Sequence, residues 1–365
     1  MLYVLPLTTA FAGIEHVVHA IAEELATTSG ERLDVHVLSS FPHPEITERP
    51  VRYTLHLISA ERLRGLLVPL VRFFAHNRFD IVVVPQCELS VVCGGALRIT
   101  NRSALLVTHL HGNPKIEEEN SPLVFQIYRR FVLPHVAALL AVSPSLAAYA
   151  RQHLADRQPV YFAPNPVRQF PIPTRSTPDS PIHRFVSVGR LSRQKGHDVL
   201  LRAFAKVHAA VPRATLVIIG NGPEEEALRQ LSSTLGLDAH VTFTGYLADP
   251  SPYLQSSDCF VLASRWEGFA LVLVEAMSLG LPLVATDCEF GPSDIISDDR
   301  IGRVARREDP DALPAAMPAQ AATPLRADDV AYRREKARRF ASPNVAGDHL
   351  RTITQICAER TMIVS

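Results

Sequence analysis

The chain has 365 residues, more than one hydrophobic core usually supports, so we expect two domains. Its 37 basic and 37 acidic residues cancel, and this balance argues against nucleic acid or another polyanion as a partner. Its five cysteines form no Cys-x-x-Cys pair and several lie in apolar runs, which argues against a disulfide scaffold and favours a cytoplasmic protein.

The first residues of the chain are apolar. They lack the basic start of a signal peptide, and Pro6 interrupts a run that is already short, so a buried strand explains them better. A loop follows, and then a helix with Val17 and Ile21 on one stripe, which is the opening of a doubly wound α/β domain. Further apolar runs typical of parallel strands occupy residues 34–39, 81–84, 104–107 and 139–143. No stretch approaches the roughly 20 apolar residues of a membrane-spanning helix.

Apolar residues stand at helical spacing from Arg62 to Arg78, with arginines among them. The pattern predicts an amphipathic helix, although Pro69 weakens it as one continuous element. Packing on the sheet is the plainer interpretation, and peripheral contact with an anionic membrane surface is the sharper one.

Two histidines alternate after the strand at 104–107. His109 and His111 would face the same side of an extended strand and could bind a metal, but no third ligand stands nearby, so we expect no metal site. At this point a structural role and a functional role for His111 are equally open. The acidic run Glu117 to Glu119 reads most simply as solvated.

Residues 169–182 are rich in proline, serine and threonine, which is the composition of a linker between domains. The strand that follows, at 185–188, runs into a loop that starts at Gly189 and is bracketed by Arg190 and Lys195. Gly189 permits a sharp turn, and the two cations would stand at the carboxyl edge of the sheet, where ligands of open α/β sheets bind. Solvated basic residues of an ordinary loop are the alternative.

The next strand, at 214–219, ends in Gly220 and Asn221. This turn is not a Walker loop, because no Gly-Lys-Ser or Gly-Lys-Thr follows it. A third strand, at 241–244, leads to Tyr246, which could stack on a ligand or simply pack.

Two glutamates follow the apolar run at 259–263. Glu267 lies in the predicted strand-to-helix turn and Glu275 in the first turns of the helix, whose opening N–H groups would come from Gly268, Phe269 and Ala270. A helix N-terminus holds phosphate, whereas an ionised carboxylate only accepts hydrogen bonds and so suits hydroxyls. A ligand with both phosphate and hydroxyl groups indicates a nucleotide sugar. The alternative is that Glu267 only stabilises the helix N-terminus and that Glu275 is an ordinary surface residue.

Glu267 and Glu275, with seven residues between them, resemble the paired-glutamate signature of the retaining GT-B glycosyltransferases of family 4. Gly189, Arg190 and Lys195 resemble that family's diphosphate clamp. His111 resembles its histidine beside the transferred sugar. The resemblance covers nearly the whole chain and is strongest from about 185 to 302.

The same resemblance implies a GT-B fold, that is, two Rossmann-like doubly wound domains facing a cleft. The N-terminal, acceptor-side domain would comprise residues 1–168, with a C-terminal helix at 344–365 crossing back to it. The linker would be 169–182, and residues 183–343 would form the C-terminal domain that binds the nucleotide sugar.

As to function, the resemblance implies a retaining, metal-independent enzyme that needs no cofactor. It would move a sugar from a UDP-sugar or GDP-sugar to a glycan or lipid-linked acceptor in cell-envelope polysaccharide synthesis, at the inner face of the cytoplasmic membrane. Arg190 and Lys195 would neutralise the diphosphate, Glu275 would hold the ribose, Glu267 would hold the sugar hydroxyls, and His111 would lie near the anomeric centre. Further donor contacts are implied at Gly13, Gly189, Gly220, Asn221, Tyr246, Gly268, Phe269 and Ala270.

Two other functions fit the same fold. A nucleotide-sugar epimerase would need no acceptor, and a non-catalytic nucleotide-sugar-binding protein would not need the charged groups that are all present here. An NAD-dependent oxidoreductase is disfavoured, because Gly-x-Gly-x-x-Gly does not follow the first strand.

Overall fold

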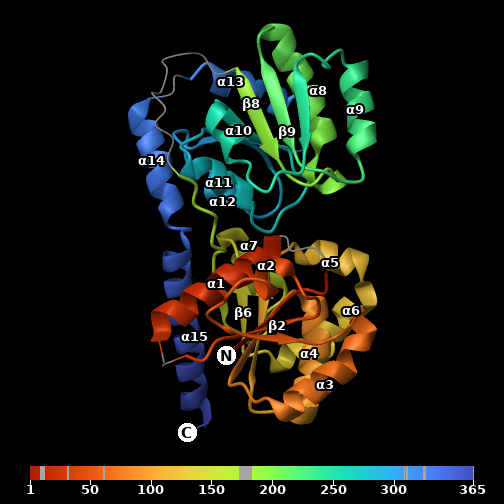
Figure 1. Ribbon diagram of the computed structural model, residues 1–365, viewed down its shortest axis with the longest axis vertical. Coiled ribbons are helices and arrows are strands. Elements are labelled where there is room, and N and C mark those ends of the chain that lie inside the picture. Colours follow the sequence, from red (N-terminus) through yellow and green to blue (C-terminus); the bar gives the residue numbers. More distant parts are fainter. Residues whose placement is uncertain are drawn as a thin grey trace. The chain divides into compact units, whose positions relative to one another are not determined.

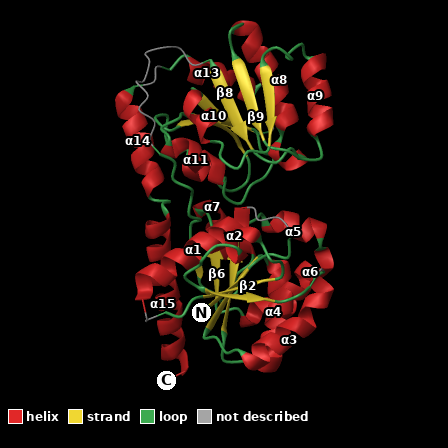
Figure 2. Ribbon diagram, viewed as in Figure 1, coloured by secondary structure: helices red, strands yellow, loops and turns green. Residues whose placement is uncertain are grey.

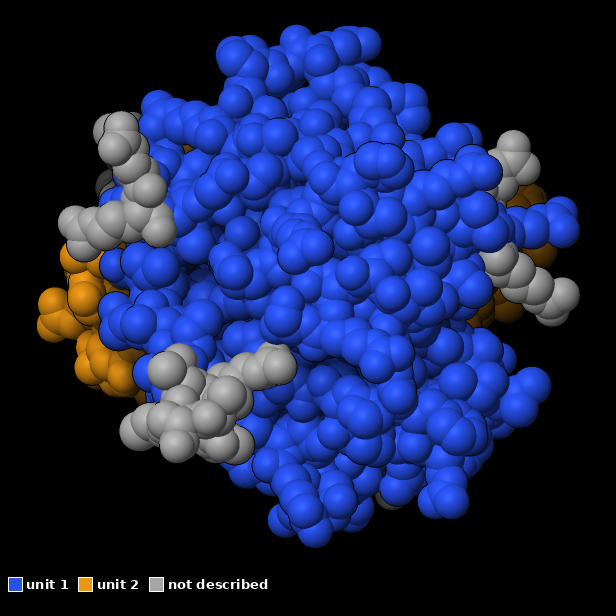
Figure 3. All heavy atoms as spheres, turned by 90° about the horizontal axis from the view of Figure 1, so that it is seen from below, with its two compact units in different colours: residues 1–166, 340–365 blue, residues 167–339 orange. Residues whose placement is uncertain are grey.

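The computed structural model describes residues 1–8, 13–30, 33–60, 62–171, 183–307, 309, 311–323 and 326–364. The chain divides into two compact units (Figure 1; Figure 3). Unit 1 comprises Met1–Pro166 and Phe340–Ser365, and unit 2 comprises Val167–Arg339. From the sequence we expected these boundaries at 168 and 344, and most of the expected linker, residues 172–182, lies outside the described residues.

Unit 1 is built on a seven-stranded parallel sheet of order β3-β2-β1-β4-β5-β6-β7. Strands β4, β5 and β6 are buried along their whole length, as expected for apolar strands covered on both faces. The strand order reverses between β1 and β4. The strands are β1 Leu2–Val4, β2 His36–Ser39, β3 Thr54–Leu57, β4 Ile81–Pro85, β5 Leu105–Leu110, β6 Ala138–Ala141 and β7 Val160–Phe162.

Helices flank this sheet (Figure 2), and the C-terminal helix α15 packs on α1 within the same unit. The segment from Arg62 to Arg78 forms a 3₁₀ turn, Leu63–Leu66, and then α3. Pro69 lies in the first turn of α3, where a missing N–H costs no helical hydrogen bond. The α-helices are α1 Gly13–Ser29, α2 Pro44–Thr47, α3 Leu67–His76, α4 Cys87–Thr100, α5 Pro114–Asn120, α6 Pro122–Ile127, α7 Pro144–His153 and α15 Ser342–Val364; a π-helical turn, Tyr128–Val132, and a 3₁₀ turn, Leu133–His135, follow α6.

Unit 2 is built on a six-stranded parallel sheet of order β10-β9-β8-β11-β12-β13. The order reverses between β8 and β11, which are neighbours although two other strands separate them in the chain. The strands are β8 Arg184–Val188, β9 Thr215–Ile219, β10 Val241–Gly245, β11 Cys259–Leu262, β12 Leu283–Asp287 and β13 Gly302–Arg306. The helices are α8 His197–Ala210, α9 Glu225–Thr234, α10 Ser251–Ser256, α11 Leu271–Ser278, α12 Pro292–Ile295, α13 Ala312–Ala321 and α14 Ala327–Arg338, with a 3₁₀ turn at Arg193–Lys195.

Candidate functional site

Two loops meet at the carboxyl edge of the unit 2 sheet. One follows β8 and spans 189–196, and the other follows β11 and spans 263–270. Because β8 and β11 pair at the point where the strand order reverses, the loops that follow these two strands lie next to each other at this edge. Open α/β sheets bind ligands at this switch point. Arg190, Lys195 and Glu267 all belong to the two loops at this point.

Lys195 and Glu267 form the centre of this edge. The Lys195 Nζ lies 2.7 Å from the Glu267 Oε1, and the two side chains are 19% and 6% exposed. The Ser264 Oγ donates to the same carboxylate oxygen at 2.6 Å, and the Thr286 hydroxyl donates to the Ser264 carbonyl oxygen at 2.6 Å. The buried carboxylate is therefore held by a cation and a hydroxyl, both on one oxygen.

A second set of contacts ties the two loops together. The Arg265 guanidinium binds both carboxylate oxygens of Asp198, at 2.9 and 2.7 Å, and the Arg265 N–H donates to the Gln194 carbonyl oxygen at 2.7 Å. The Gln194 side chain donates to the Trp266 carbonyl oxygen at 3.1 Å. Burial raises the pKa of Asp198, but the hydrogen bonds and the charge of Arg265, together with backbone hydrogen bonds, outweigh it and hold that pKa below its usual value. This ion pair joins residues 67 positions apart, and no local pattern in the sequence announces it.

Glycines let the loops approach this closely. Gly196 has φ +62°, and a Cβ there would lie 2.0 Å from the Ala263 carbonyl oxygen. Gly220 has φ +141°, and a Cβ there would lie 2.0 Å from the Gly189 carbonyl oxygen. The Gly220 turn thus packs directly against the cationic loop, so its glycine is needed for packing whether or not a ligand touches it.

Three further predicted residues of unit 2 lie on the loops that follow β8, β9 and β10. Arg190 is exposed, and its side chain has no ion pair or hydrogen bond with any residue that the structure describes. Tyr246 is 69% exposed and follows Gly245, which accepts a hydrogen bond from the Gly220 N–H at 2.9 Å. Asn221 is exposed on the Gly220 turn, and its carbonyl oxygen accepts from the Leu191 N–H.

Glu275, the second glutamate of the predicted pair, lies within helix α11, whereas Glu267 lies in the loop before it. Helix α11 begins at Leu271 with Ala270 at its N-cap, so Gly268 and Phe269 lie in the loop directly before the helix. That their N–H groups bind the donor stays a prediction. Glu275 is half-buried in the second turn of α11. Burial raises the pKa of Glu275 to about 7, and the charge of Arg168 acts against this rise.

In unit 1, His111 belongs to a buried histidine cluster after β5. The rings of His109 and His111 lie 3.9 Å apart between centroids, and His349 of α15 lies 5.3 Å from His109. Burial lowers the pKa of His111 to about 3 and that of His349 to about 4, so both rings are neutral at pH 7. The sequence did not point to His349, because it lies 240 residues downstream of His109 in an ordinary helical stretch.

The described residues contain no group of histidine, cysteine or acidic side chains that could hold a metal ion. Gly13 opens α1 and is exposed, but the loop before it, residues 9–12, lies outside the described residues. The predicted approach of this loop to the donor therefore stays a prediction.

Glu117 differs from the sequence interpretation, because it is not solvated. Its Oε2 accepts from the Cys87 N–H at 3.0 Å, and so it caps the N-terminus of α4. Gln86, which precedes that helix, has φ +67°, an unusual backbone conformation at the carboxyl end of β4. Burial raises the pKa of Glu117 to about 7, although the hydrogen bond from Cys87 opposes the shift.

Comparison with known proteins agrees with this architecture. Residues 175–326 match the family described as "Glycosyl transferases group 1", and residues 11–169 match the family described as "Glycosyltransferase Family 4". An uncharacterized glycosyltransferase of Methanocaldococcus jannaschii is 40% identical over 112 residues, 31% of this chain and 28% of that protein. The lipopolysaccharide core biosynthesis glycosyltransferase LpsD of Rhizobium meliloti is 32% identical over 169 residues, 45% of this chain and 48% of that protein. The matched part spans less than half the length of either relative.

Solved structures match over nearly the whole chain. Sucrose-phosphate synthase from Thermosynechococcus elongatus superposes with a TM-score of 0.78 at 19% identity, covering 98% of this chain and 99% of that one. Anabaena HepE in complex with UDP and glucose gives 0.77 at 19% identity, covering 97% and 99%. These likenesses show the GT-B fold of two Rossmann-like domains. The chain belongs to the group 1 glycosyltransferases of family 4.

Proposed function

We propose that this protein transfers a sugar from a UDP-sugar or GDP-sugar to a glycan or lipid-linked acceptor, with retention of configuration and without a metal ion. The observation that carries the proposal is the Lys195–Glu267 pair at the switch point of unit 2. It places a cation suited to phosphate and a carboxylate suited to hydroxyls on adjoining loops.

The chemistry asked of unit 2 is to meet the negative charge that grows on the leaving diphosphate as the sugar–phosphate bond breaks. Arg190 has no carboxylate partner among the described residues and can bind two phosphate oxygens in its fork. Lys195 is already held in place by Glu267, so it costs little reorganisation when the charge develops. Together the two cations supply the positive charge that a divalent ion would otherwise bring, and Lys195 is the one that is held in place beforehand.

In this proposal Glu267 binds the transferred sugar. Its Oε1 already accepts from Lys195 and Ser264, which leaves Oε2 to accept from a sugar hydroxyl. Glu275 would accept from the ribose hydroxyls, and binding them as a carboxylate would draw its raised pKa back down. His111 is neutral, so it would act beside the anomeric centre as a hydrogen-bonding group and not as a cation.

The names of the relatives support the proposed classes of donor and acceptor, but they do not identify the donor and acceptor of this protein. One is a GDP-mannose-dependent phosphatidylinositol monomannoside mannosyltransferase of Mycolicibacterium smegmatis, and HepE of Anabaena was solved with UDP. LpsD of Rhizobium meliloti is named for lipopolysaccharide core biosynthesis, from which we infer a role in envelope glycan synthesis here.

We also propose peripheral contact with an anionic membrane at the cytoplasmic face through the segment from Arg62 to Arg78. Helix α3 buries Leu70 and Phe74 but leaves Leu67 39% and Val68 59% exposed, so an apolar edge faces outward beside the basic residues. No helix in the described ranges is long and apolar enough to cross a bilayer.

A thermal-shift panel of nucleoside diphosphates tests donor binding, because a ligand that binds only the folded state raises Tm. UDP or GDP should raise Tm, and the effective base names the donor class. Incubation of the matching nucleotide sugars without an acceptor then separates the alternatives. Interconversion of sugars would indicate an epimerase, and binding without turnover, with or without an acceptor, would indicate a non-catalytic protein.

A further inference from the structure

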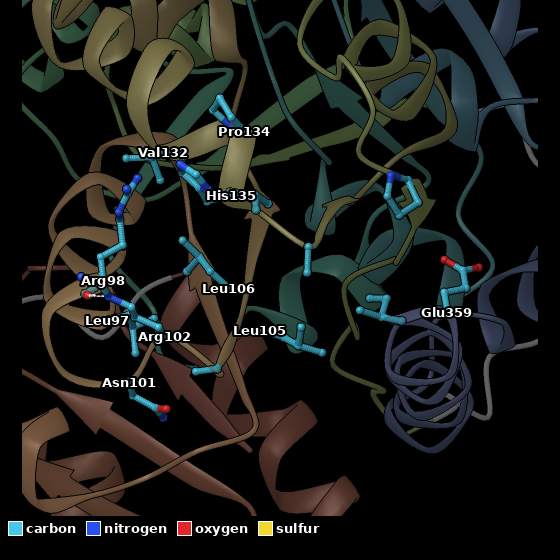
Figure 4. A pocket seen from close by; sticks show the side chains of 16 residues that line it. Leu97, Arg98, Asn101, Arg102, Leu105, Leu106, Val132, Pro134, His135 and Glu359 are labelled. Atoms are coloured by element: carbon cyan, nitrogen blue, oxygen red, sulfur yellow. Dashed lines mark hydrogen bonds between the residues drawn. The ribbon is translucent and has the colours of Figure 1, made fainter. Parts of the chain in front are cut away.

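A cavity of about 480 Å³ opens in unit 1 at the edge of the sheet opposite His111 (Figure 4). It is lined where β5 and β6 begin, at Leu105 and Ala137, whereas His111 follows the carboxyl end of β5. His111 lies six residues after Leu105 along the extended strand, a distance of about 20 Å. The cavity is therefore not part of the candidate site.

The two ends of the cavity differ in charge. Figure 4 shows Arg98 and Arg102 together on one side and Glu359, from α15, on the other. Glu359 is already engaged, since its carboxylate accepts from the Tyr161 hydroxyl at 2.9 Å and from the Gln355 side chain at 2.9 Å. Apolar side chains also line the cavity, among them Leu97, Leu106, Val132 and Ile356.

The arginines have no acidic partner within the described part of the chain. Arg98 makes one long contact of 3.5 Å to the Phe131 carbonyl oxygen, and the Arg102 Nε donates to the Arg98 carbonyl oxygen at 2.8 Å. Both are exposed near the end of α4, where a cation also stabilises the helix dipole. Stabilisation of the helix dipole would need neither a second arginine nor the apolar cavity that lies between the two arginines and α15.

Apolar side chains also face solvent beside the arginines. Ile99 is 67% exposed and Phe131 is 61% exposed, and both are sequence neighbours of residues that line the cavity, Arg98 and Val132. Cations interleaved with exposed apolar groups around an apolar hollow match the division of an anionic amphiphile into head and tail.

We propose that this cavity binds one acyl chain of an anionic glycerophospholipid, with its phosphate on the guanidinium groups of Arg98 and Arg102. The guanidinium fork suits phosphate oxygens, and the volume lies within the range of small-molecule sites. The carboxylate of Glu359 at the far end repels an anionic head and so fixes the direction of the lipid. The site anchors the protein to one lipid, apart from the sugar chemistry, and does not depend on the proposed transferase activity.

Isothermal titration of the full chain with a twelve-carbon monoacyl phosphatidylglycerol, kept below its micelle concentration, tests the proposal. We expect saturable binding of one lipid per chain in the sub-millimolar range. The double variant Arg98→Gln/Arg102→Gln should weaken it about tenfold or more. Ala137→Phe, which fills the cavity, should abolish it. The exposed Arg213→Gln in unit 2 is the matched control and should bind as the wild type does.

Three outcomes of the binding experiments would overturn the proposal. They are no saturable binding, a double arginine variant that binds within twofold of wild type, and an uncharged monoacylglycerol that binds as tightly as the anionic lipid. A dimer that Ala137→Phe dissociates in light scattering would also overturn it, because a second copy would then cover the cavity. If Ala137→Phe does not fold, the exposed arginines decide alone. Transferase activity is measured separately, so failure of one idea leaves the other standing.

Discussion

At the scale of single residues, the proposed function turns on how Glu267 is held. Lys195 and Ser264 both donate to its Oε1, at 2.7 and 2.6 Å, and all three side chains are largely shielded from water. A carboxylate fixed in this way presents its second oxygen in one direction, which is what recognition of a particular sugar hydroxyl requires.

Removing the Ser264 hydroxyl should loosen that carboxylate. Ser264→Ala loses a hydrogen bond to a charged group, so we expect the free energy of unfolding to fall by about 1.5–3 kcal/mol. We also expect kcat/KM for the nucleotide sugar to fall about tenfold, mostly through kcat, because positioning matters most in the transition state. Denaturant unfolding and initial rates measure the two effects. Ser256→Ala, at an exposed serine of the same unit, is the control, and equal effects of the two changes would contradict the role of Ser264.

Glu117 makes stability depend on pH in a predictable direction. Its pKa rises from about 4.5 in the unfolded chain to about 7 in the folded one, so the folded state holds the proton more tightly. Ionisation of Glu117 therefore destabilises the fold as pH rises from about 4.5 to about 7, and the cost persists above that range. Glu117→Gln should raise the free energy of unfolding by roughly 1–3 kcal/mol at pH 8, with little effect at pH 4.5.

Thermal or denaturant unfolding of Glu117→Gln at the two pH values measures this difference. Glu119→Gln, at an exposed position of the same helix, should change stability little at either pH. If Glu117→Gln changes the free energy of unfolding by the same amount at both pH values, the prediction is contradicted, because Glu117 then titrates like a solvated carboxylate.

At the scale of elements, the candidate site is the meeting of two loops, and Arg265 fastens one to the other. It pairs with Asp198 of α8 and binds the Gln194 carbonyl oxygen through its own N–H. The pair is partly exposed, so its own contribution to stability is modest. Its larger effect is to hold Lys195 and Glu267, which lie on the two loops, in one arrangement.

Arg265→Ala should therefore affect function more than stability. We expect the free energy of unfolding to fall by about 1 kcal/mol or less. We expect KM for the nucleotide sugar to rise several-fold, because the cationic loop is no longer held against the acidic loop. Arg229→Ala, which breaks an exposed pair with Glu225 on α9, is the matched control and should leave KM unchanged. An unchanged KM in Arg265→Ala would show that the two loops keep their arrangement without the Arg265–Asp198 ion pair.

Helix α3 carries the proposed membrane contact through its outward apolar edge. Val68→Glu places a charge where the acyl boundary would lie, so the fraction of protein that floats with anionic vesicles should fall severalfold. Tyr253→Glu introduces the same charge at an exposed apolar residue of unit 2 and should leave flotation unchanged. No flotation of the wild-type protein would end the proposal for α3.

At the scale of the whole molecule, the two parallel sheets were largely predictable. Apolar runs such as 104–107 and 259–263 are short, and turn residues and helical patterns follow them, so buried parallel strands are the expected interpretation. The cationic loop and Glu267 were predictable because local motifs encode them, and the structure brings Lys195 and Glu267 together.

The remaining site contacts depend on residues far apart in the sequence. Arg265 with Asp198, and His349 with His109, are set by the packing of whole helices, which no local pattern specifies. Glu117 looked like part of a solvated run because burial is a tertiary property, and three adjacent acids give no sign that one of them caps another helix.

The central claim is that Lys195 meets the diphosphate of a nucleotide sugar beside Glu267, and initial-rate kinetics of Lys195→Ala test it most directly. With the donor that the thermal-shift panel selects, kcat/KM should fall roughly 10²-fold or more, while Lys206→Ala, at an exposed lysine of unit 2, retains wild-type kinetics. Wild-type turnover by a correctly folded Lys195→Ala variant would contradict the claim.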